Sequence, residues 1–101
     1  MDADTRISGS TRLVGLIGSP VTYSGSPAVH NAVFEKMGYD FAFVPFDVKP
    51  ENLEAAVRGM EALGFLGYNV TAPYKSAVVP YLHEISRVAE IMGAVNIVVV
   101  Q

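Results

Sequence analysis

The sequence predicts an α/β fold, a three-layer α/β/α domain built around a mainly parallel sheet. Apolar runs of strand length alternate along the chain with segments that carry helix start and stop signals, in the order strand, helix, strand, helix, strand, helix, strand. That order is typical of parallel sheets with right-handed crossover connections. Half of the residues are hydrophobic and only 17% are charged, as expected for strands that are buried on both faces.

The first strand and the first helix are separated by a serine-containing turn. Residues 12–18 (RLVGLIG) are an apolar run of strand length. Ser26-Pro27 predicts a helix start, because a serine hydroxyl can cap the first turn and proline fits the first helical position. We expect this helix to run to Met37 and to stop at Gly38.

The second strand and the second helix follow. Residues 39–48 (YDFAFVPFDV) alternate as a strand does, and Pro45 within them favours a sheet edge or a bulge. Pro50-Glu51 opens a helix with an acidic first turn, which Gly64 ends. Its apolar positions recur at helical spacing: Leu53, Ala56, Val57, Met60 and Leu63.

Residues 65–71 (FLGYNVT) and 94–101 (AVNIVVVQ) are the third and fourth predicted strands. Between them, Ala72-Pro73 turns the chain into one or two short helices interrupted by Pro80, and a further helix is expected over residues 86–92.

The predicted organisation is a flexible polar tail over residues 1–11 and one domain over residues 12–101. The chain stops on apolar residues, whereas domains usually finish in exposed polar ones. We therefore expect it to be a piece of a longer protein.

Composition argues against several classes of function. The seven Lys and Arg residues are scattered and the net charge is −3, so no basic patch for nucleic acid is expected. The longest apolar run, residues 77–82, is far shorter than the roughly 20 residues of a membrane span. Without cysteine, and with His30 and His83 far apart in the sequence, no metal site is expected. A cytoplasmic location fits this composition.

Three polar stretches fall where strands of an α/β sheet end, which is where such folds bind ligands. Ser24 and Ser26 precede the first helix, and their hydroxyls with the free amides of the helix start could seat an anion or a carboxylate. The plainer interpretation of Ser26 is capping alone.

Asn69 and Thr71 lie on the same side of the third strand, and Lys75 follows the turn at Pro73. These groups would suit a polyhydroxylated ligand, and Lys75 could transfer a proton to or from it. The alternative interpretation is a solvated strand end without a ligand. Asn96 interrupts an apolar strand, so its amide either ties down backbone or reaches a ligand.

Residues 15–18 (GLIG) do not match the dinucleotide-binding fingerprint, because they lack its third glycine and its spacing. The chain is therefore not expected to bind a dinucleotide by itself.

Three stretches stand out, in this order: residues 15–34 (GLIGSPVTYSGSPAVHNAVF), 45–75 (ending NVTAPYK) and 93–96 (GAVN). Together they resemble the N-terminal substrate-binding domain of the shikimate dehydrogenase family. The resemblance covers residues 13–100. It implies a two-domain enzyme that interconverts shikimate and 3-dehydroshikimate, with NADP, or in some relatives NAD, held by a C-terminal domain beyond this chain. Some relatives act on quinate, and the family includes monomers and homodimers.

The resemblance also implies roles for individual residues. Ser24 and Ser26 would hold the substrate carboxylate, and Lys75 would be the catalytic residue. The remaining contacts to the ring hydroxyls would come from Asn69, Thr71 and Asn96.

Four positions depart from the commonest family pattern: Tyr23, Gly25, Tyr74 and Ile97. Ile97 stands where threonine is usual, which leaves the choice between shikimate, quinate and an amino analogue open. Two other classes of function fit the same stretches. One is a stand-alone module that binds a carboxylate or cyclitol, and the other is a flavodoxin-like domain that binds phosphate at residues 24–27.

Overall fold

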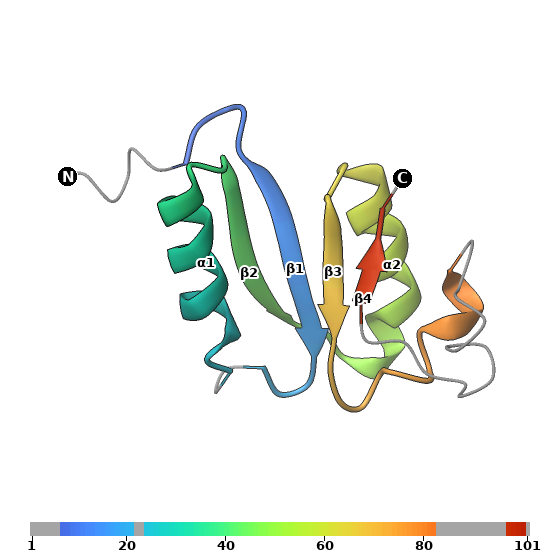
Figure 1. Cartoon of the computed structure of the whole chain (residues 1–101). Helices are drawn as coiled ribbons and strands as arrows, with labels where there is room; N and C mark the ends of the chain where they lie inside the picture. The colour runs from blue at the N-terminus through green and yellow to red at the C-terminus, as the bar shows by residue number, and fades with distance from the viewer. Residues whose placement is uncertain (1–6, 22–23, 83–96, 101) are drawn as a thin grey trace.

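The computed structural model describes residues 7–21, 24–82 and 97–100. Its centre is a four-stranded sheet in the order β2-β1-β3-β4 (Figure 1). The strands are β1 (Arg12–Gly18), β2 (Phe41–Asp47), β3 (Gly67–Val70) and β4 (Ile97–Val99). β1 pairs in parallel with both β2 and β3, so the predicted mainly parallel α/β sheet is confirmed.

β4 runs antiparallel to β3, whereas the alternation of elements favoured parallel pairing throughout. An antiparallel neighbour needs a connection that leaves and re-enters the sheet at the same end, without a crossover. The β-branched composition of the last strand suits either direction, so the sequence pattern could not decide between them.

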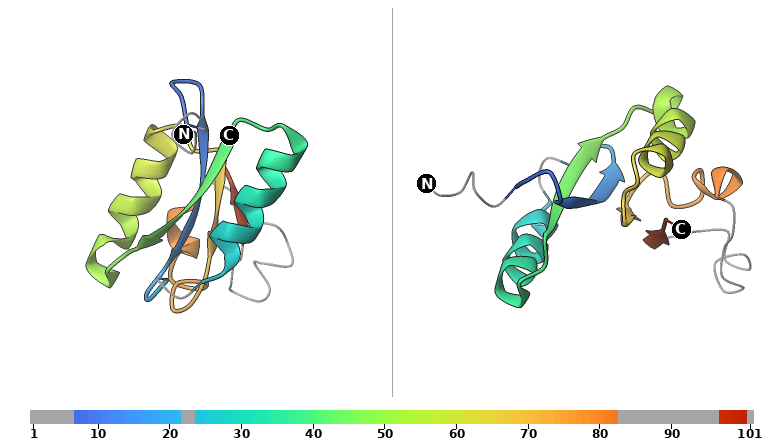
Figure 2. Two further views of the ribbon diagram at one scale, coloured as in Figure 1. Left: turned by 90° about the vertical axis from the view of Figure 1, so that its left-hand side faces the viewer. Right: turned by 90° about the horizontal axis from the view of Figure 1, so that it is seen from above.

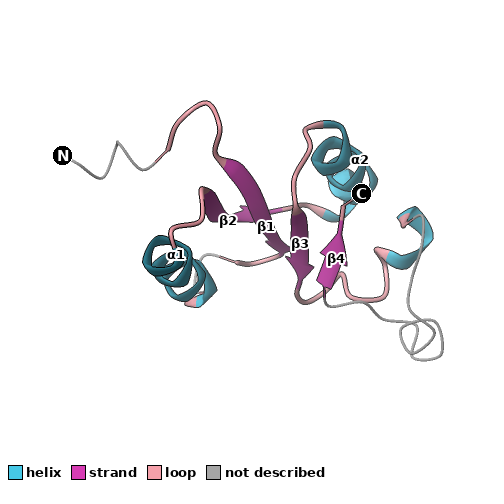
Figure 3. Cartoon of the chain, turned by 45° about the horizontal axis from the view of Figure 1, so that its top comes forward, coloured by secondary structure: helices cyan, strands magenta, loops and turns pink. Residues whose placement is uncertain are grey.

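The two long helices cover opposite faces of the sheet and make it the middle of three layers (Figures 2 and 3). They are α1 (Ser26–Met37) and α2 (Leu53–Ala62). Two short 3-10 helices, η2 (Pro50–Asn52) and η3 (Val79–Tyr81), lie at the start of α2 and after β3. The predicted end of α1 at Met37 is confirmed, because Gly38 adopts the left-handed φ of 75° that ends the helix.

Two apolar clusters hold the layers together. The larger lies between the sheet and α2 and includes Ile17, Val57, Tyr68 and Tyr74. The smaller lies between the sheet and α1 and centres on Leu16, Val21 and Phe43. Since β1 and β3 contribute alternate side chains to the two faces, the polar side chains of β3 must come out on the α1 side.

Pro45 lies in β2, which is an edge strand, as its position in the sequence predicted. Pro80 does not interrupt a helix as expected, since it lies within η3. Proline fits there because the first residues of a helix do not need their N–H groups.

Residues 8–11, which the sequence assigned to the tail, form a turn beside the first strand. The hydroxyls of Ser10 and Thr11 both donate to the carboxylate of Asp40, the latter over 2.7 Å. The helix predicted over residues 86–92 lies outside the described residues, as does the beginning of the last predicted strand. Among the described helices, none is long and apolar enough to cross a membrane.

Candidate functional site

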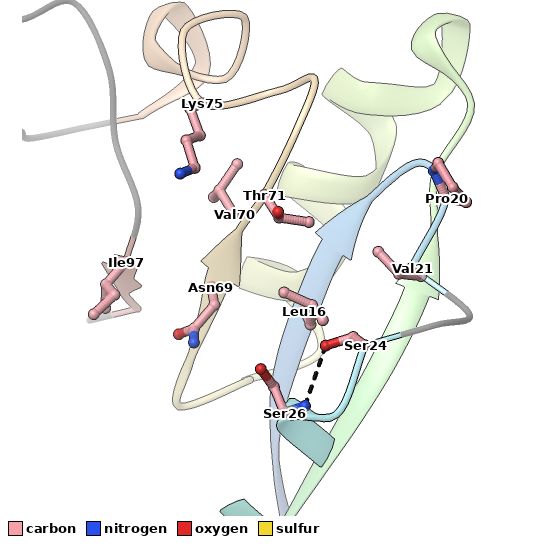
Figure 4. Close-up of a pocket in the computed structure, with 10 residues that line it drawn as sticks. All are labelled: Leu16, Pro20, Val21, Ser24, Ser26, Asn69, Val70, Thr71, Lys75 and Ile97. Atoms are coloured by element: carbon pink, nitrogen blue, oxygen red, sulfur yellow. Dashed lines mark hydrogen bonds between the residues drawn. The ribbon is translucent and has the colours of Figure 1, made fainter. Parts of the chain in front are cut away.

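A hollow of about 530 Å³ opens at the carboxyl ends of β1 and β3, beside the start of α1 (Figure 4). Its lining residues are Leu16, Pro20, Val21, Ser24, Ser26, Asn69, Val70, Thr71, Lys75 and Ile97. Five of the six side chains predicted to form a site therefore meet in one place. The sixth, Asn96, lies outside the described residues.

The turn before α1 brings the two serines to the hollow. The Ser24 hydroxyl accepts a hydrogen bond from the backbone N–H of Ser26 over 3.2 Å. Gly25 is the N-cap residue, and no side chain caps the helix in the usual way. The expectation that Ser26 caps α1 is therefore wrong, because the helix begins one residue earlier than the Ser-Pro signal suggested.

The serine hydroxyl that bonds to the start of α1 is therefore that of Ser24 and not that of Ser26. Ser24 holds the helix start, although its own hydroxyl hydrogen remains available to a ligand. The Ser26 hydroxyl has no hydrogen-bond partner among the described residues, and in Figure 4 it points toward the side of the hollow where Asn69 lies. Both hydroxyls can thus act as donors.

β3 aims Asn69 and Thr71 into the hollow. Asn69 is opposite Leu16 in the pairing of β1 with β3, and its flanking residues Tyr68 and Val70 are buried on the α2 side. Strand alternation therefore turns Asn69 to the opposite, α1 side. Thr71 continues the strand line, since its N–H donates to the Ile17 carbonyl over 2.9 Å.

Lys75 reaches the hollow from the turn that follows β3. The N–H of Tyr74 donates to the Thr71 carbonyl over 3.1 Å, which closes this turn. The Lys75 side chain is exposed, and in Figure 4 its nitrogen points toward the side where Asn69 and Ile97 lie. It forms no ion pair with any residue that the structure describes, so the amine is available to a ligand.

The charge in the lining of the hollow is positive. Lys75 is the single charged side chain among the ten lining residues, and none of the ten carries a carboxylate. Hydroxyl and amide groups supply the other polar atoms. Such a lining suits a small anion that also carries hydroxyl groups.

Comparison with known proteins shows to which family the chain belongs. The family described as the shikimate dehydrogenase substrate binding domain matches residues 16–98. The chain belongs to the shikimate dehydrogenase family. The resemblance noted in the sequence is thereby confirmed.

Individual members of the family agree with this assignment. The chain is 52% identical over 90 residues to a shikimate dehydrogenase (NADP(+)) of Methanobrevibacter smithii, covering 89% of this chain and 32% of that protein. A crystal structure of the Listeria monocytogenes shikimate 5-dehydrogenase with shikimate and NAD superposes with a TM-score of 0.90 at 42% identity, over 93% of this chain and 32% of that one. The quinate dehydrogenase of Corynebacterium glutamicum, in complex with NAD, gives a TM-score of 0.81 at 36% identity, over 90% and 34%.

The chain thus spans about a third of the length of the shikimate dehydrogenases it matches. The names of these relatives include the dinucleotides NADP(+) and NAD. Glycines that cradle a pyrophosphate leave their Cα faces open to it. Here a β-carbon on Gly15 would touch Phe65 and Met60, and one on Gly18 would collide with Thr71. The space beside these two glycines is filled by the protein's own packing, so they do not form a cradle for a pyrophosphate.

His30 has a structural role in this family member. Its ring stacks on Phe43 at a centroid distance of 4.3 Å, and its Nδ1 lies 2.9 Å from the Ser26 carbonyl oxygen. In the described ranges no three metal-ligating side chains gather. His83 lies outside those ranges.

Sequence reasoning missed the apolar part of the shikimate dehydrogenase hollow. Leu16, Val21 and Val70 line it together with Pro20. Leu16 could have been found, because it lies directly opposite Asn69 once β1 and β3 are paired. Pro20 and Val21 belong to the loop after β1, at the edge where ligands of such sheets bind.

Proposed function

We propose that this chain is the substrate-binding domain of a shikimate dehydrogenase, which interconverts shikimate and 3-dehydroshikimate with NADP. The observation that carries the proposal is the meeting of Ser24, Ser26, Asn69, Thr71 and Lys75 around one hollow. Their hydroxyl, amide and ammonium groups match a ring that bears one carboxylate and several hydroxyls. Family membership gives the reaction class.

In this proposal the substrate carboxylate lies against Ser24 and Ser26. Both serines can donate a hydrogen bond to it, and the first N–H groups of α1 add the favourable field of a helix start. The ring hydroxyls then face Asn69, Thr71 and Lys75. Asn96 is proposed to complete this side of the ring, as the family pattern implies.

Lys75 is the proposed catalytic residue. Oxidation of a ring hydroxyl to a ketone removes its O–H proton and the hydride on the same carbon. A lysine in its neutral amine form, in hydrogen-bond reach, can accept the proton, and the ammonium so formed can return it in the reverse direction. The hydride acceptor is the nicotinamide, which we assign to a part of the longer protein outside this chain.

The assignment of cofactor and setting follows the family. The similar protein of Methanobrevibacter smithii carries NADP(+) in its name, which favours NADP over NAD. The enzyme would then serve the route to aromatic amino acids in the cytoplasm, in keeping with a cysteine-free chain. Assembly as a homodimer stays a prediction.

The test is the change Lys75→Ala in the full-length protein. We expect kcat to fall by about 10²- to 10⁴-fold, the range that general acid–base catalysis contributes, with little change in KM for shikimate. Lys36→Ala is the matched control, since Lys36 is exposed in the last turn of α1, away from the hollow. Unchanged turnover of Lys75→Ala would remove the proposed role.

Quinate is the second candidate substrate, with NAD as its cofactor. It is favoured by Ile97, an apolar residue in the lining of the hollow, and by the likeness to a quinate dehydrogenase. Steady-state kinetics with shikimate and quinate, each with NAD and NADP, decide between the two. A stand-alone carboxylate-binding module would bind these acids and oxidise neither.

A further inference from the structure

Tyr74 directly precedes Lys75 and occupies the opposite side of the same turn. Its side chain is 3% exposed and packs in the apolar cluster between the sheet and α2. Lys75 is exposed and extends toward the hollow (Figure 4). The turn therefore has a buried anchor and a solvent-facing amine on neighbouring residues.

The Tyr74 hydroxyl donates a hydrogen bond to the carbonyl oxygen of Val48, 26 residues away in the sequence. Val48 itself follows β2, and its N–H donates to the Gly18 carbonyl at the end of β1 over 3.0 Å. The hydroxyl thus connects the turn after β3 to the segment after β2, which is in turn held to the end of β1.

Within the described residues, the other backbone hydrogen bonds of the turn run inside it or to the end of β1 and the residue that follows. The Tyr74 carbonyl accepts from the Val78 N–H over 3.0 Å, and the Ala72 carbonyl accepts from the Ser19 N–H over 3.1 Å. Among the described residues, no hydrogen bond of the Lys75 side chain itself fixes where the amine lies. The placement of that amine therefore depends on the backbone of the turn.

We propose that Tyr74 is a positioning residue for Lys75, acting through the hydrogen bond from its hydroxyl to the Val48 carbonyl. The proposal rests on the proposed catalytic role of Lys75 and adds the feature that fixes it. Hydrophobic packing of the ring would secure the fold without the hydroxyl. The hydroxyl fixes the orientation of the turn, because its hydrogen bond links the turn to the Val48 carbonyl just after β2.

The hydroxyl is suited to a permanent link. Burial raises the pKa of Tyr74 above its ordinary value, and the nearby carboxylates of Asp47 and Glu51 raise it further. The group therefore stays protonated, and stays a donor, throughout the pH range in which the enzyme would work. A histidine at this position would lack that constancy.

The test is Tyr74→Phe in the full-length enzyme, which removes the hydroxyl and keeps the ring. We expect kcat to fall about tenfold to a hundredfold, the loss that a misplacement of about 1 Å can bring, while KM for shikimate changes less than about twofold. Incorporation of 4-aminophenylalanine at position 74 keeps a donor and should restore most of kcat.

The matched control is Tyr68→Phe, which removes a hydroxyl from the same apolar cluster without touching the turn. It should leave kcat within about twofold of the parent enzyme. The change Tyr74→Phe should also cause no further loss in a Lys75→Ala background, because a positioning residue acts only through the group it positions.

The outcomes separate the two proposals. An unchanged kcat in Tyr74→Phe, or an equal loss in the presence and absence of Lys75, overturns the positioning role and leaves the function intact. A loss that 4-aminophenylalanine does not restore also overturns it. Full activity of Lys75→Ala, in contrast, overturns the catalytic role of Lys75 and with it the positioning role of Tyr74. Failure of the parent full-length protein to oxidise shikimate overturns the proposed function itself.

Discussion

Gly18 and Thr71 are packed so closely that a β-carbon on Gly18 would lie 2.3 Å from the Thr71 Cγ2 methyl. Gly18 ends β1, and Thr71 follows β3 at the wall of the hollow. The absence of a side chain at one strand end is what allows the next strand to bring its threonine alongside. Fold and site are thus coupled at a single contact.

The first prediction concerns this contact. Gly18→Ala should displace Thr71 and lower the free energy of unfolding by about 1–3 kcal/mol, the usual cost of overpacking. KM for shikimate should rise in the same variant, because Thr71 loses its place in the lining. Gly59→Ala is the control, since a β-carbon there meets nothing within 4 Å. Equal stability and KM in both variants would contradict the coupling.

The second prediction concerns how α1 is held to the sheet. Asn31 spans the outer side of β2, where its amide donates to the Phe43 carbonyl over 2.9 Å and its carbonyl accepts from the Phe43 N–H over 2.7 Å. Asn31→Leu leaves both backbone groups without this partner. We expect a loss of about 1–3 kcal/mol in the free energy of unfolding, measured with urea. Asn52→Ala, at an exposed position whose side chain makes no capping bond, should change it by less than about 0.5 kcal/mol.

The third prediction separates the two serines. Ser26→Ala removes a hydroxyl that has no hydrogen bond within the described residues, so the free energy of unfolding should not change. Loss of one hydrogen bond to a charged group costs about 1.5–3 kcal/mol, so KM for shikimate should rise about tenfold or more. The methyl ester of shikimate lacks the charge and should be affected less. Equal effects on acid and ester would argue against a carboxylate at Ser26.

The fourth prediction concerns alkaline pH. Burial, and after it the charge of Glu61, raises the pKa of Tyr68 from 10.0 to about 12. Below pH 10 the phenol is neutral in both the folded and the unfolded chain. Above it the unfolded chain loses the proton first, so stability falls as the pH rises from 10 to 12.

Urea unfolding at pH 9 and pH 11 measures this loss. Tyr68→Phe should show a smaller decrease between the two pH values than the parent chain, because the ionising group is gone. The decrease should not vanish, since the pKa of Tyr74 is raised as well. An identical decrease in both proteins would mean that Tyr68 does not contribute.

Local signals in the sequence were enough for most of the fold. The Ser-Pro signal located the start of α1 to within one residue, the glycine stop located its end, and Pro45 favoured an edge position for β2. The direction of β4 could not be predicted, because it depends on where a connection crosses the sheet rather than on strand composition. The start of α2 also differs from the predicted one. The signal at Pro50 opens a 3-10 turn, and the α-helix begins only at Leu53.

The candidate site was predicted in its polar members and not in its apolar ones. Hydroxyl, amide and amine groups at strand ends stand out in a sequence, whereas Leu16 or Val21 look like ordinary core residues until the sheet is assembled. The exchange of roles between Ser24 and Ser26 was also missed. A shift of one residue in the helix start decides which hydroxyl bonds to the first turn, and sequence signals locate helix ends only to within a residue or two.

The account depends most on a single carboxylated ring lying between the serine turn and Lys75. A crystal structure of the full-length protein with bound shikimate measures this directly. We expect the carboxylate within hydrogen-bond distance of the Ser24 and Ser26 hydroxyls, and the Lys75 amine within reach of a ring hydroxyl. Shikimate bound outside the hollow, or with its carboxylate turned to Lys75 and away from both serines, would contradict the account.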